Sequence, residues 1–304
     1  MNLYKPSPTA LIIISFAAVY LGWGTTYLAN HFLLEEIPSF VIGCIRFGLA
    51  GSLALIWVIV RGQFRLQKSD IISALIGGLM LIAVGQGALI YANQFIATGM
   101  VAMLCTALPL WSVLLEWCLG DRPPVKTLIG LLIAMLGISL LVGNTFGETT
   151  GWQQWFAMGL VLGCTLLWAM GGWLLGKRPP FRSNWLGMAL QMLVGSCALA
   201  ILSSLHNDWE KFSWQALSAQ SWWWMVYLVL PVSLGVFPAY YWLLRNVRLS
   251  TVSTFAFVNP MVALLLGWLV LDEQLNTSAL LACAITLSGV VLLILGRSRR
   301  KPLN

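Results

Sequence analysis

ALIYANQFIATGMVAMLCTALP (Ala88–Pro109) and AYYWLLRNVRLSTVSTFAFVNP (Ala239–Pro260) align without a gap at an offset of about 151 residues. Further upstream, Trp23 aligns with Trp168 at an offset of about 145 residues. Few aligned residues are identical, so the match depends on the spacing of these landmarks. A repeat of this length predicts a chain built from two related halves, residues 1–146 and 147–304.

The composition is that of a protein embedded in lipid. Of the 304 residues, 59% are hydrophobic and 9% are charged, and the mean hydropathy is +0.85. Soluble domains contain about 25% charged residues. The net charge of +7 comes from short loops beside apolar runs. Membrane topology accounts for this charge, so we expect no nucleic-acid partner.

Ten apolar runs approach the roughly 20 residues that a helix needs to cross the hydrocarbon core of a bilayer. They are Thr9–Asn30, Pro38–Val60, Asp70–Asn93, Ala97–Cys118, Pro124–Val142, Gln154–Gly176, Asn184–Ser204, Gln220–Leu244, Leu249–Leu271 and Asn276–Gly296. The short gaps leave no room for a soluble catalytic domain, and there is no G-x-x-x-x-G-K-[ST] motif for ATP. Transport driven by ATP hydrolysis within this chain is therefore excluded.

The charges of the gaps sort to opposite sides of the membrane. Of the 17 Lys and Arg residues, 15 lie in the terminal segments and in every second gap, and Lys211 alone lies in the alternate gaps. The alternate gaps contain the acidic residues Glu35, Glu36, Glu148, Asp208, Glu210, Asp272 and Glu273. Positive residues collect on the cytoplasmic side of membrane proteins. Both termini are therefore expected in the cytoplasm.

Each half has five helices, which is an odd number, so the first half begins and ends on opposite sides of the membrane. The second half therefore enters the membrane from the side opposite to the first. We predict an all-α polytopic membrane protein with ten transmembrane helices, arranged as two inverted-topology five-helix repeats. Two packings related by a pseudo-two-fold axis can exchange roles, opening first to one side and then to the other. The architecture therefore favours a transporter that works by alternating access.

Four elements resemble the EamA branch of the drug/metabolite transporter superfamily. They are LGWGTTYL (Leu21–Leu28), PSFVIGCIRFGLAG (Pro38–Gly51), ALPLWSVLLEWCLGD (Ala107–Asp121) and FVNPMVALLLGWLVLDE (Phe257–Glu273). In this order and spacing, the resemblance covers essentially the whole chain. It implies export or exchange of small metabolites across a bacterial inner (plasma) membrane, with amino acids, other amphipathic metabolites and toxic compounds as substrates of family members. It does not identify a substrate.

Arg46 is the positive residue that topology leaves unexplained, since it lies about a third of the way into the second helix. It aligns with Gln191 in the repeat. An Arg at this depth costs about 2.5–3.5 kcal/mol on insertion scales, so it should face protein or a water-filled cavity. Two interpretations are open: an anchor for an anionic group such as a substrate carboxylate, and a structural Arg that binds backbone carbonyls of a neighbouring helix. The resembling family often has Arg here, which favours the structural interpretation.

Other polar and aromatic side chains near the midplane are candidates for substrate binding. With Arg46, the set is Trp23, Thr26, Gln86, Tyr91, Trp168, Gln191 and Asn259. Amides in membrane helices more often bridge helices than bind ligands, and aromatic residues more often pack. As a set, they predict a central pocket for a small amphipathic substrate.

Pro109 and Pro260 are expected to kink the fourth and ninth helices and to free backbone carbonyls there.

Two further features have competing interpretations. Glu116 resembles a proton-coupling carboxylate, but it lies within about one turn of the cytoplasmic end of its helix, where it is expected to reach the interface or pair with Arg. Proton coupling, uniport and exchange all stay open. Gly159 and Gly163 form a G-x-x-x-G motif that either mediates dimerisation or, as we expect, permits close contact within the bundle. The chain is then a monomer or a homodimer.

The sequence gives no support for an enzyme. His31 and His206 lie at the outer side, so no H-E-x-x-H or intramembrane His/Asp cluster is present for metal chemistry. The six cysteines include no C-x-x-C pair. We expect no metal and no cofactor. The predicted function is secondary transport of small amphipathic metabolites, such as amino acids or related compounds. A channel-like facilitator and a multidrug efflux carrier are the alternatives.

Overall fold

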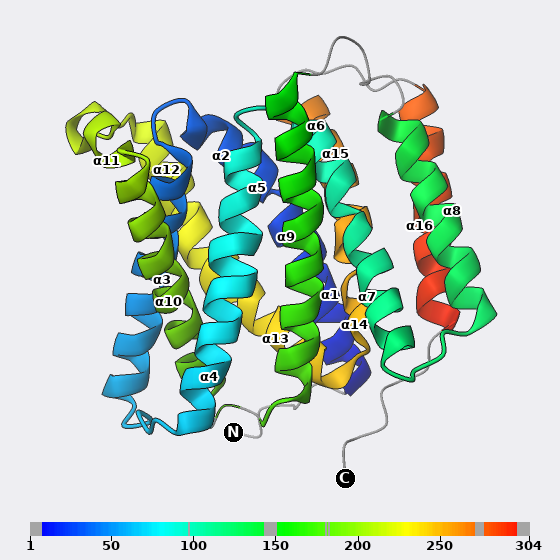
Figure 1. Cartoon of the computed structure of the whole chain (residues 1–304), viewed down its shortest axis with the longest axis horizontal. Coiled ribbons are helices and arrows are strands. Elements are labelled where there is room, and N and C mark those ends of the chain that lie inside the picture. Colours follow the sequence, from blue (N-terminus) through cyan, green and yellow to red (C-terminus); the bar gives the residue numbers. More distant parts are fainter. Residues whose placement is uncertain are drawn as a thin grey trace.

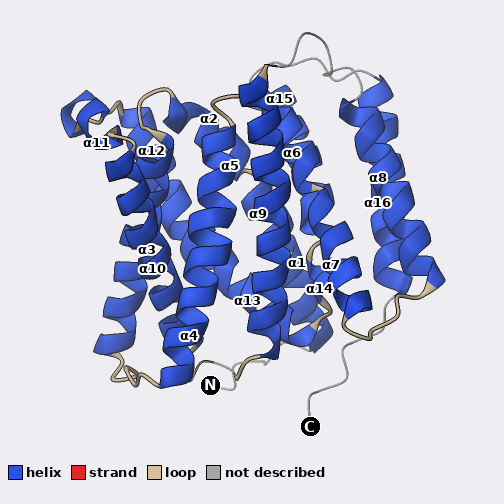
Figure 2. Cartoon of the chain, viewed as in Figure 1, coloured by secondary structure: helices blue, strands red, loops and turns tan. Residues whose placement is uncertain are grey.

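The computed structural model describes residues 8–96, 98–142, 151–179, 181, 183–270 and 277–296. Within these ranges every regular element is a helix, and loops connect them (Figure 2). Helices satisfy all backbone hydrogen bonds internally, which lipid requires because it offers no partners. The prediction of an all-helical membrane protein is confirmed.

Ten helical segments occupy the ten predicted runs. They are α1–α2 (Pro8–Gly24, Thr26–Leu34), α3 (Ser39–Val60), α4–η1–α5 (Lys68–Ile76, Gly77–Gln86, Gly87–Ala92), α6–α7 (Thr98–Cys105, Ala107–Cys118), α8 (Val125–Val142), α9 (Trp152–Lys177), α10 (Asn184–Leu205), α12–η3–α13 (Ala219–Tyr227, Leu228–Val236, Phe237–Asn246), α14–α15 (Leu249–Val252, Phe255–Val270) and α16 (Thr277–Gly296). Short α11 (Asp208–Lys211) and η2 (Trp214–Ala216) lie between α10 and α12. Seven segments are long and apolar enough to span a membrane, and the other three contain shorter apolar helices.

The two halves pack through equivalent helices. The second segments, α3 and α10, pack against each other, as do the fifth segments, α8 and α16. These pairs lie at opposite ends of the molecule, with α1 and α9 between them (Figure 1). Helix α1 begins, and α16 ends, at the end of the bundle opposite α11 (Figure 1). Two inverted five-helix repeats are expected to pack in this way, with equivalent helices against each other.

Two π-helical segments, which the sequence reasoning missed, occupy equivalent places in the halves. Segment η1 begins at Gly77 and η3 begins at Leu228, 151 positions apart, which is the offset of the sequence repeat. Glycines cluster in and beside η1, and Pro231 interrupts the donor ladder of η3. Such π segments are rare and are often found at functional sites.

Glycines end two helices at the basic side of the bundle. Gly62 follows α3 with φ of 63°, and Gly120 follows α7 with φ of 95°. In each case the next residue donates its backbone N–H to a carbonyl five residues earlier, from Gln63 to Val58 and from Asp121 to Glu116. This is the Schellman termination, which favours glycine because the left-handed conformation strains other residues.

Close helix contact occurs at α8 and α16, and the expectation for the G-x-x-x-G motif is wrong. A Cβ atom added at Gly159 or Gly163 of α9 would meet no described atom within 4 Å. Both glycines are exposed on the lipid-facing side of α9. By contrast, Gly130 of α8 and Gly289 of α16 bring two backbones together. A small-residue motif permits close approach without specifying which helix approaches.

Candidate functional site

A cavity of about 50 Å³ lies at the interface of the two halves. Its walls come from α1, α2, η1, α5, α6, α7, α9 and α15. Its lining residues are Trp23, Thr26, Tyr27, Asn30, Gln86, Leu89, Ile90, Asn93, Cys105, Leu108, Cys164, Thr165, Trp168, Phe255, Ala256 and Asn259. One water molecule needs roughly 10–15 Å³ of such volume. The cavity therefore holds a few waters and must widen to hold a metabolite.

Aromatic rings form one wall of this cavity. Trp23 and Trp168, the pair that aligned in the repeat, meet edge to face with centroids 5.6 Å apart. Trp23 also contacts Phe255 at 4.7 Å and Tyr240 at 4.9 Å. The Trp168 indole N–H donates to the Tyr240 hydroxyl at 2.8 Å, which fixes the ring. Offset and edge-to-face pairs of this kind add stability beyond their buried area.

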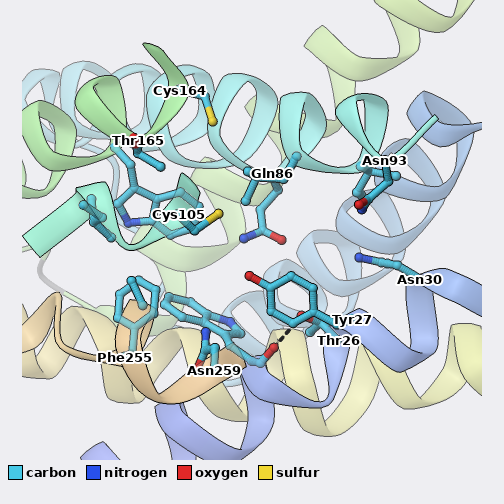
Figure 3. A pocket seen from close by; sticks show the side chains of 16 residues that line it. Thr26, Tyr27, Asn30, Gln86, Asn93, Cys105, Cys164, Thr165, Phe255 and Asn259 are labelled. Carbon is cyan, nitrogen blue, oxygen red and sulfur yellow. Dashed lines mark hydrogen bonds between the residues drawn. The ribbon is translucent and has the colours of Figure 1, made fainter. Parts of the chain in front are cut away.

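Amide side chains supply the polar groups of the cavity. Gln86 points into it, and Asn30 and Asn93 lie together at one end, away from Phe255 (Figure 3). The Oδ1 atoms of Asn30 and Asn93 are buried and have no hydrogen-bond partner among the described residues. Asn259 differs, because its side-chain amide has hydrogen-bond partners. With the amide oriented to bind them, Nδ2 donates to the carbonyls of Phe255 at 3.0 Å and Tyr20 at 3.3 Å. Asn259 therefore bridges α15 and α1 while it lines the cavity.

The cavity brings together five of the eight residues proposed from the sequence, and three lie elsewhere. The five are Trp23, Thr26, Gln86, Trp168 and Asn259. Tyr91 stacks on Phe40 with centroids 5.0 Å apart, near His206. Gln191 lines a separate cavity of about 20 Å³ with Tyr241. Arg46 is buried between α3 and η3 and lines none of these cavities.

Several lining residues were missed by the sequence reasoning. Tyr27, Asn30, Asn93 and Thr165 are polar, and the thiols of Cys105 and Cys164 also face the cavity (Figure 3). All six cysteines are free, and Cys118 and Cys197 are exposed. Asn30 and Asn93 stand at the ends of predicted runs, so a search for amides near helix ends would have found them.

An acidic recess of about 510 Å³ lies outside the amide end of the cavity. Asn93 lines both the recess and the cavity. The other polar lining residues are Glu35, Glu36, Ser39, Gln94, Asp208 and Lys211. The backbone N–H of Ser218 donates to Glu36 at 2.9 Å, which lowers the pKa of that carboxyl, whereas burial raises the pKa of Asp208. Asn93 thus marks the place where the cavity and the recess approach each other.

The opposite end is closed by polar contacts between the halves. Ser112 and Ser253 share a hydrogen bond of 2.6 Å, and Arg248 forms a 3.0 Å ion pair with Asp121. Glu116 is 6% exposed and accepts the backbone N–H of Ser250 at 3.3 Å. It is therefore buried against the other half of the chain. Of the two expectations for Glu116, reaching the interface is wrong, and pairing with Arg stays a prediction. The start of α14 offers a backbone N–H donor, and a carboxylate is favoured beside a helix N-terminus.

One of the two predicted proline positions, Pro109, lies near a break in its segment. The fourth segment is interrupted at Thr106, three residues before Pro109. The ninth is interrupted at Ser253 and Thr254, whereas Pro260 itself lies inside α15. The first segment also breaks, at Thr25 between α1 and α2. Broken helices beside a cavity are common in transporters, because non-helical backbone is tolerated there.

A ten-helix membrane protein with inverted repeats and an enclosed cavity between them has the architecture of a secondary transporter. The model of the EamA-like transporter family matches residues 10–143 and again residues 146–295. The chain belongs to this family and is a membrane transporter.

The relatives agree with this assignment. The chain is 31% identical to the uncharacterized inner membrane transporter YedA of Escherichia coli (strain K12), over 92% of this chain and 89% of YedA. It is 24% identical to the uncharacterized transporter YoaV of Bacillus subtilis (strain 168), over 95% and 99% of the two chains. One solved crystal structure matches 95% of this chain and 98% of its own with a TM-score of 0.75 at 18% identity, which supports the fold.

Proposed function

We propose that this protein is a secondary transporter that exports or exchanges small amphipathic metabolites, such as amino acids or related compounds, across the bacterial inner membrane. The observation that carries the proposal is the enclosed cavity at the interface of the repeats, with an aromatic wall and amide groups. The aromatic wall suits an apolar body, and the amides suit a polar head group. YedA, the relative with 31% identity, is an inner membrane transporter by name.

Alternating access follows from how the two ends of the cavity are closed. Three polar contacts join the halves at the end near α14, whereas at the other end Asn93 lines both the cavity and an open recess. The reverse arrangement arises when the two halves exchange conformations. No carboxylate lines the cavity in the described part of the chain, so the proposal names no coupling ion.

Counterflow in proteoliposomes tests this function. We expect saturable accumulation of a labelled metabolite against the same unlabelled compound loaded inside, in a screen of amino acids and related amphipathic compounds. Running each compound with and without a pH gradient measures proton coupling at the same time. Single-channel conductance without counterflow would favour the facilitator alternative, and equal rates for unrelated cationic drugs would favour multidrug efflux.

We also propose that the N- and C-termini face the cytoplasm, because the basic gaps collect at that end of the bundle. Cysteines introduced at Gln63, between α3 and α4, and at Glu210, in α11, report on opposite ends. We expect a membrane-impermeant maleimide to label Glu210→Cys in intact cells and Gln63→Cys only after permeabilisation. The native chain, with its own six cysteines, is the background control. Labelling in the opposite order would contradict this orientation.

A further inference from the structure

Arg46 is a fully buried cation whose hydrogen-bonding capacity is mostly unused. Its side chain is 0% exposed. Nε donates to Ser233 Oγ at 2.9 Å, whereas Nη1 and Nη2 are buried and meet no acceptor among the described residues. The structural interpretation required backbone carbonyls around the guanidinium, and none of the described carbonyls accepts from it.

The charge of Arg46 has no anionic partner among the described residues, and its described charge contact is a cation–π contact with Phe47. No described carboxylate lies within ion-pair distance of it, and the guanidinium stands 4.7 Å from the centroid of the Phe47 ring. Arginine stays protonated in proteins. A buried charge is strongly unfavourable unless it is paired and hydrogen-bonded. The site therefore favours any anion that can reach it.

Two chains of contact connect Arg46 with the wall of the central cavity. Ser233, which accepts from Arg46, lies in η3, and Tyr227 ends α12 directly before η3. The Tyr227 hydroxyl shares a hydrogen bond with Thr25. Thr25 is the break between α1 and α2, beside the lining residue Thr26. The second chain is aromatic: Phe47 meets Phe237 at 5.8 Å, and Phe237 meets Trp23 at 5.3 Å. The break at Thr25 therefore lies between the cavity and the segment that binds Arg46.

The fold itself does not require a charge at this place. Gln191, which aligns with Arg46 in the repeat, is also 0% exposed and packs against η1, as Arg46 packs against η3. A neutral side chain therefore fills the equivalent position in the second half. The positive charge is specific to the Arg46 side, where the Ser233 hydroxyl also lies.

We propose that Arg46, with Ser233, binds the carboxylate of the transported substrate, and that the substrates are therefore amphipathic carboxylates. This inference rests on the transport function proposed above and names its substrate class. The two free Nη groups can bind both carboxylate oxygens at once, a geometry that suits guanidinium better than ammonium. The Ser233 hydroxyl, which accepts from Nε, still has a proton to donate.

The test measures thermal stability of the purified protein against matched probes. These are 3-phenylpropionate, its primary amide, 3-phenylpropylamine, L-phenylalanine and sodium chloride at equal ionic strength. We expect the two carboxylates to raise the melting temperature of the native chain, and the amide, amine and chloride to leave it unchanged. A rise of the same size with chloride would identify a site for adventitious small ions and would overturn the proposal. So would the absence of any carboxylate-dependent rise.

Variants separate ligand binding from a structural role. Arg46→Met should abolish the carboxylate response while its ligand-free melting temperature equals or exceeds that of the native chain, because an unpaired buried charge is removed. Arg46→Lys should weaken the apparent carboxylate affinity at least about 10-fold. Ser233→Ala should weaken it as well, whereas Ser203→Ala, another fully buried serine, should not. Carboxylate responses that survive in Arg46→Lys and Ser233→Ala, together with a destabilised Arg46→Met, would show a structural Arg.

Counterflow with the same probes distinguishes this inference from the proposed function. If the amine and amide exchange as fast as the carboxylates, and Arg46→Gln changes nothing, the carboxylate inference fails and transport stands. If the carboxylates stabilise the native chain through Arg46 but none is exchanged, the site stands and the proposed transport fails.

Discussion

Replacing Gly289 with leucine is expected to destabilise the protein by about 3 kcal/mol, because two helix backbones touch at this residue. A Cβ atom at Gly289 of α16 would lie 2.3 Å from the backbone nitrogen of Ala134 and 2.6 Å from the carbonyl oxygen of Gly130, both on α8. Backbone atoms cannot rotate away as a side chain can. The helices must therefore separate, and the core that Leu131 and Val290 share between them must loosen.

Gly163→Leu is the matched control, since the same substitution on α9 meets no described atom within 4 Å. Melting temperatures of both variants are measured in the same detergent. A loss of about 3 kcal/mol corresponds to roughly 5–10 °C, and the control should stay within about 0.5 kcal/mol of the native chain. Equal shifts in the two variants would show that the contact between α8 and α16 is not tight.

Trp168→Ala should reduce counterflow at least about 10-fold, the largest effect on transport that we expect from a cavity residue. The indole ring is 4% exposed, meets Trp23 edge to face and donates to Tyr240 at 2.8 Å. Its removal deletes one aromatic wall of the cavity. Truncating a buried Trp also costs about 3–5 kcal/mol, so the rate must be normalised to the amount of folded protein in the liposomes.

Two further variants make this result interpretable. Trp155→Ala makes the same truncation on α9, but Trp155 is 64% exposed, so transport should stay at the native rate. Trp168→Phe retains a ring and loses the bond to Tyr240, a bond worth about 1 kcal/mol net, so it should retain more transport than the alanine variant. If folded Trp168→Ala transports at the native rate, the aromatic wall is not part of the substrate-binding site.

Much of the candidate site could be predicted from the repeat and from depth in the membrane. Trp23 and Trp168 were paired by sequence offset, and they touch at the cavity. Depth alone was a weaker guide. Arg46, Tyr91 and Gln191 all lie within the predicted membrane runs, but none lines the cavity in this conformation. Position along the helix gives the depth of a residue in the membrane, but it does not give the direction in which the side chain faces.

Apart from the break near Pro109, the sequence also did not show where helices break or change pitch. The interruptions at Thr25 and Thr106 and the π segments η1 and η3 all occur within runs that are apolar throughout. In the fourth segment Pro109 indicated a nearby break. In η1, however, the glycines are needed for close packing, which only the tertiary structure shows. A Cβ atom at Gly85 would lie 2.4 Å from the Trp168 ring.

The sequence by itself determined the helices, their number, their two-fold repetition and their family, because apolar length and landmark spacing are properties of the linear chain. Only the tertiary structure decided which faces meet. In water, the apolar face of a helix identifies its buried side. In lipid, both the buried and the exposed faces are apolar, and close packing of small residues selects the contacts. This is why Gly130 and Gly289 pack together while Gly159 and Gly163 face outward, a difference that the same residue type could not reveal in sequence.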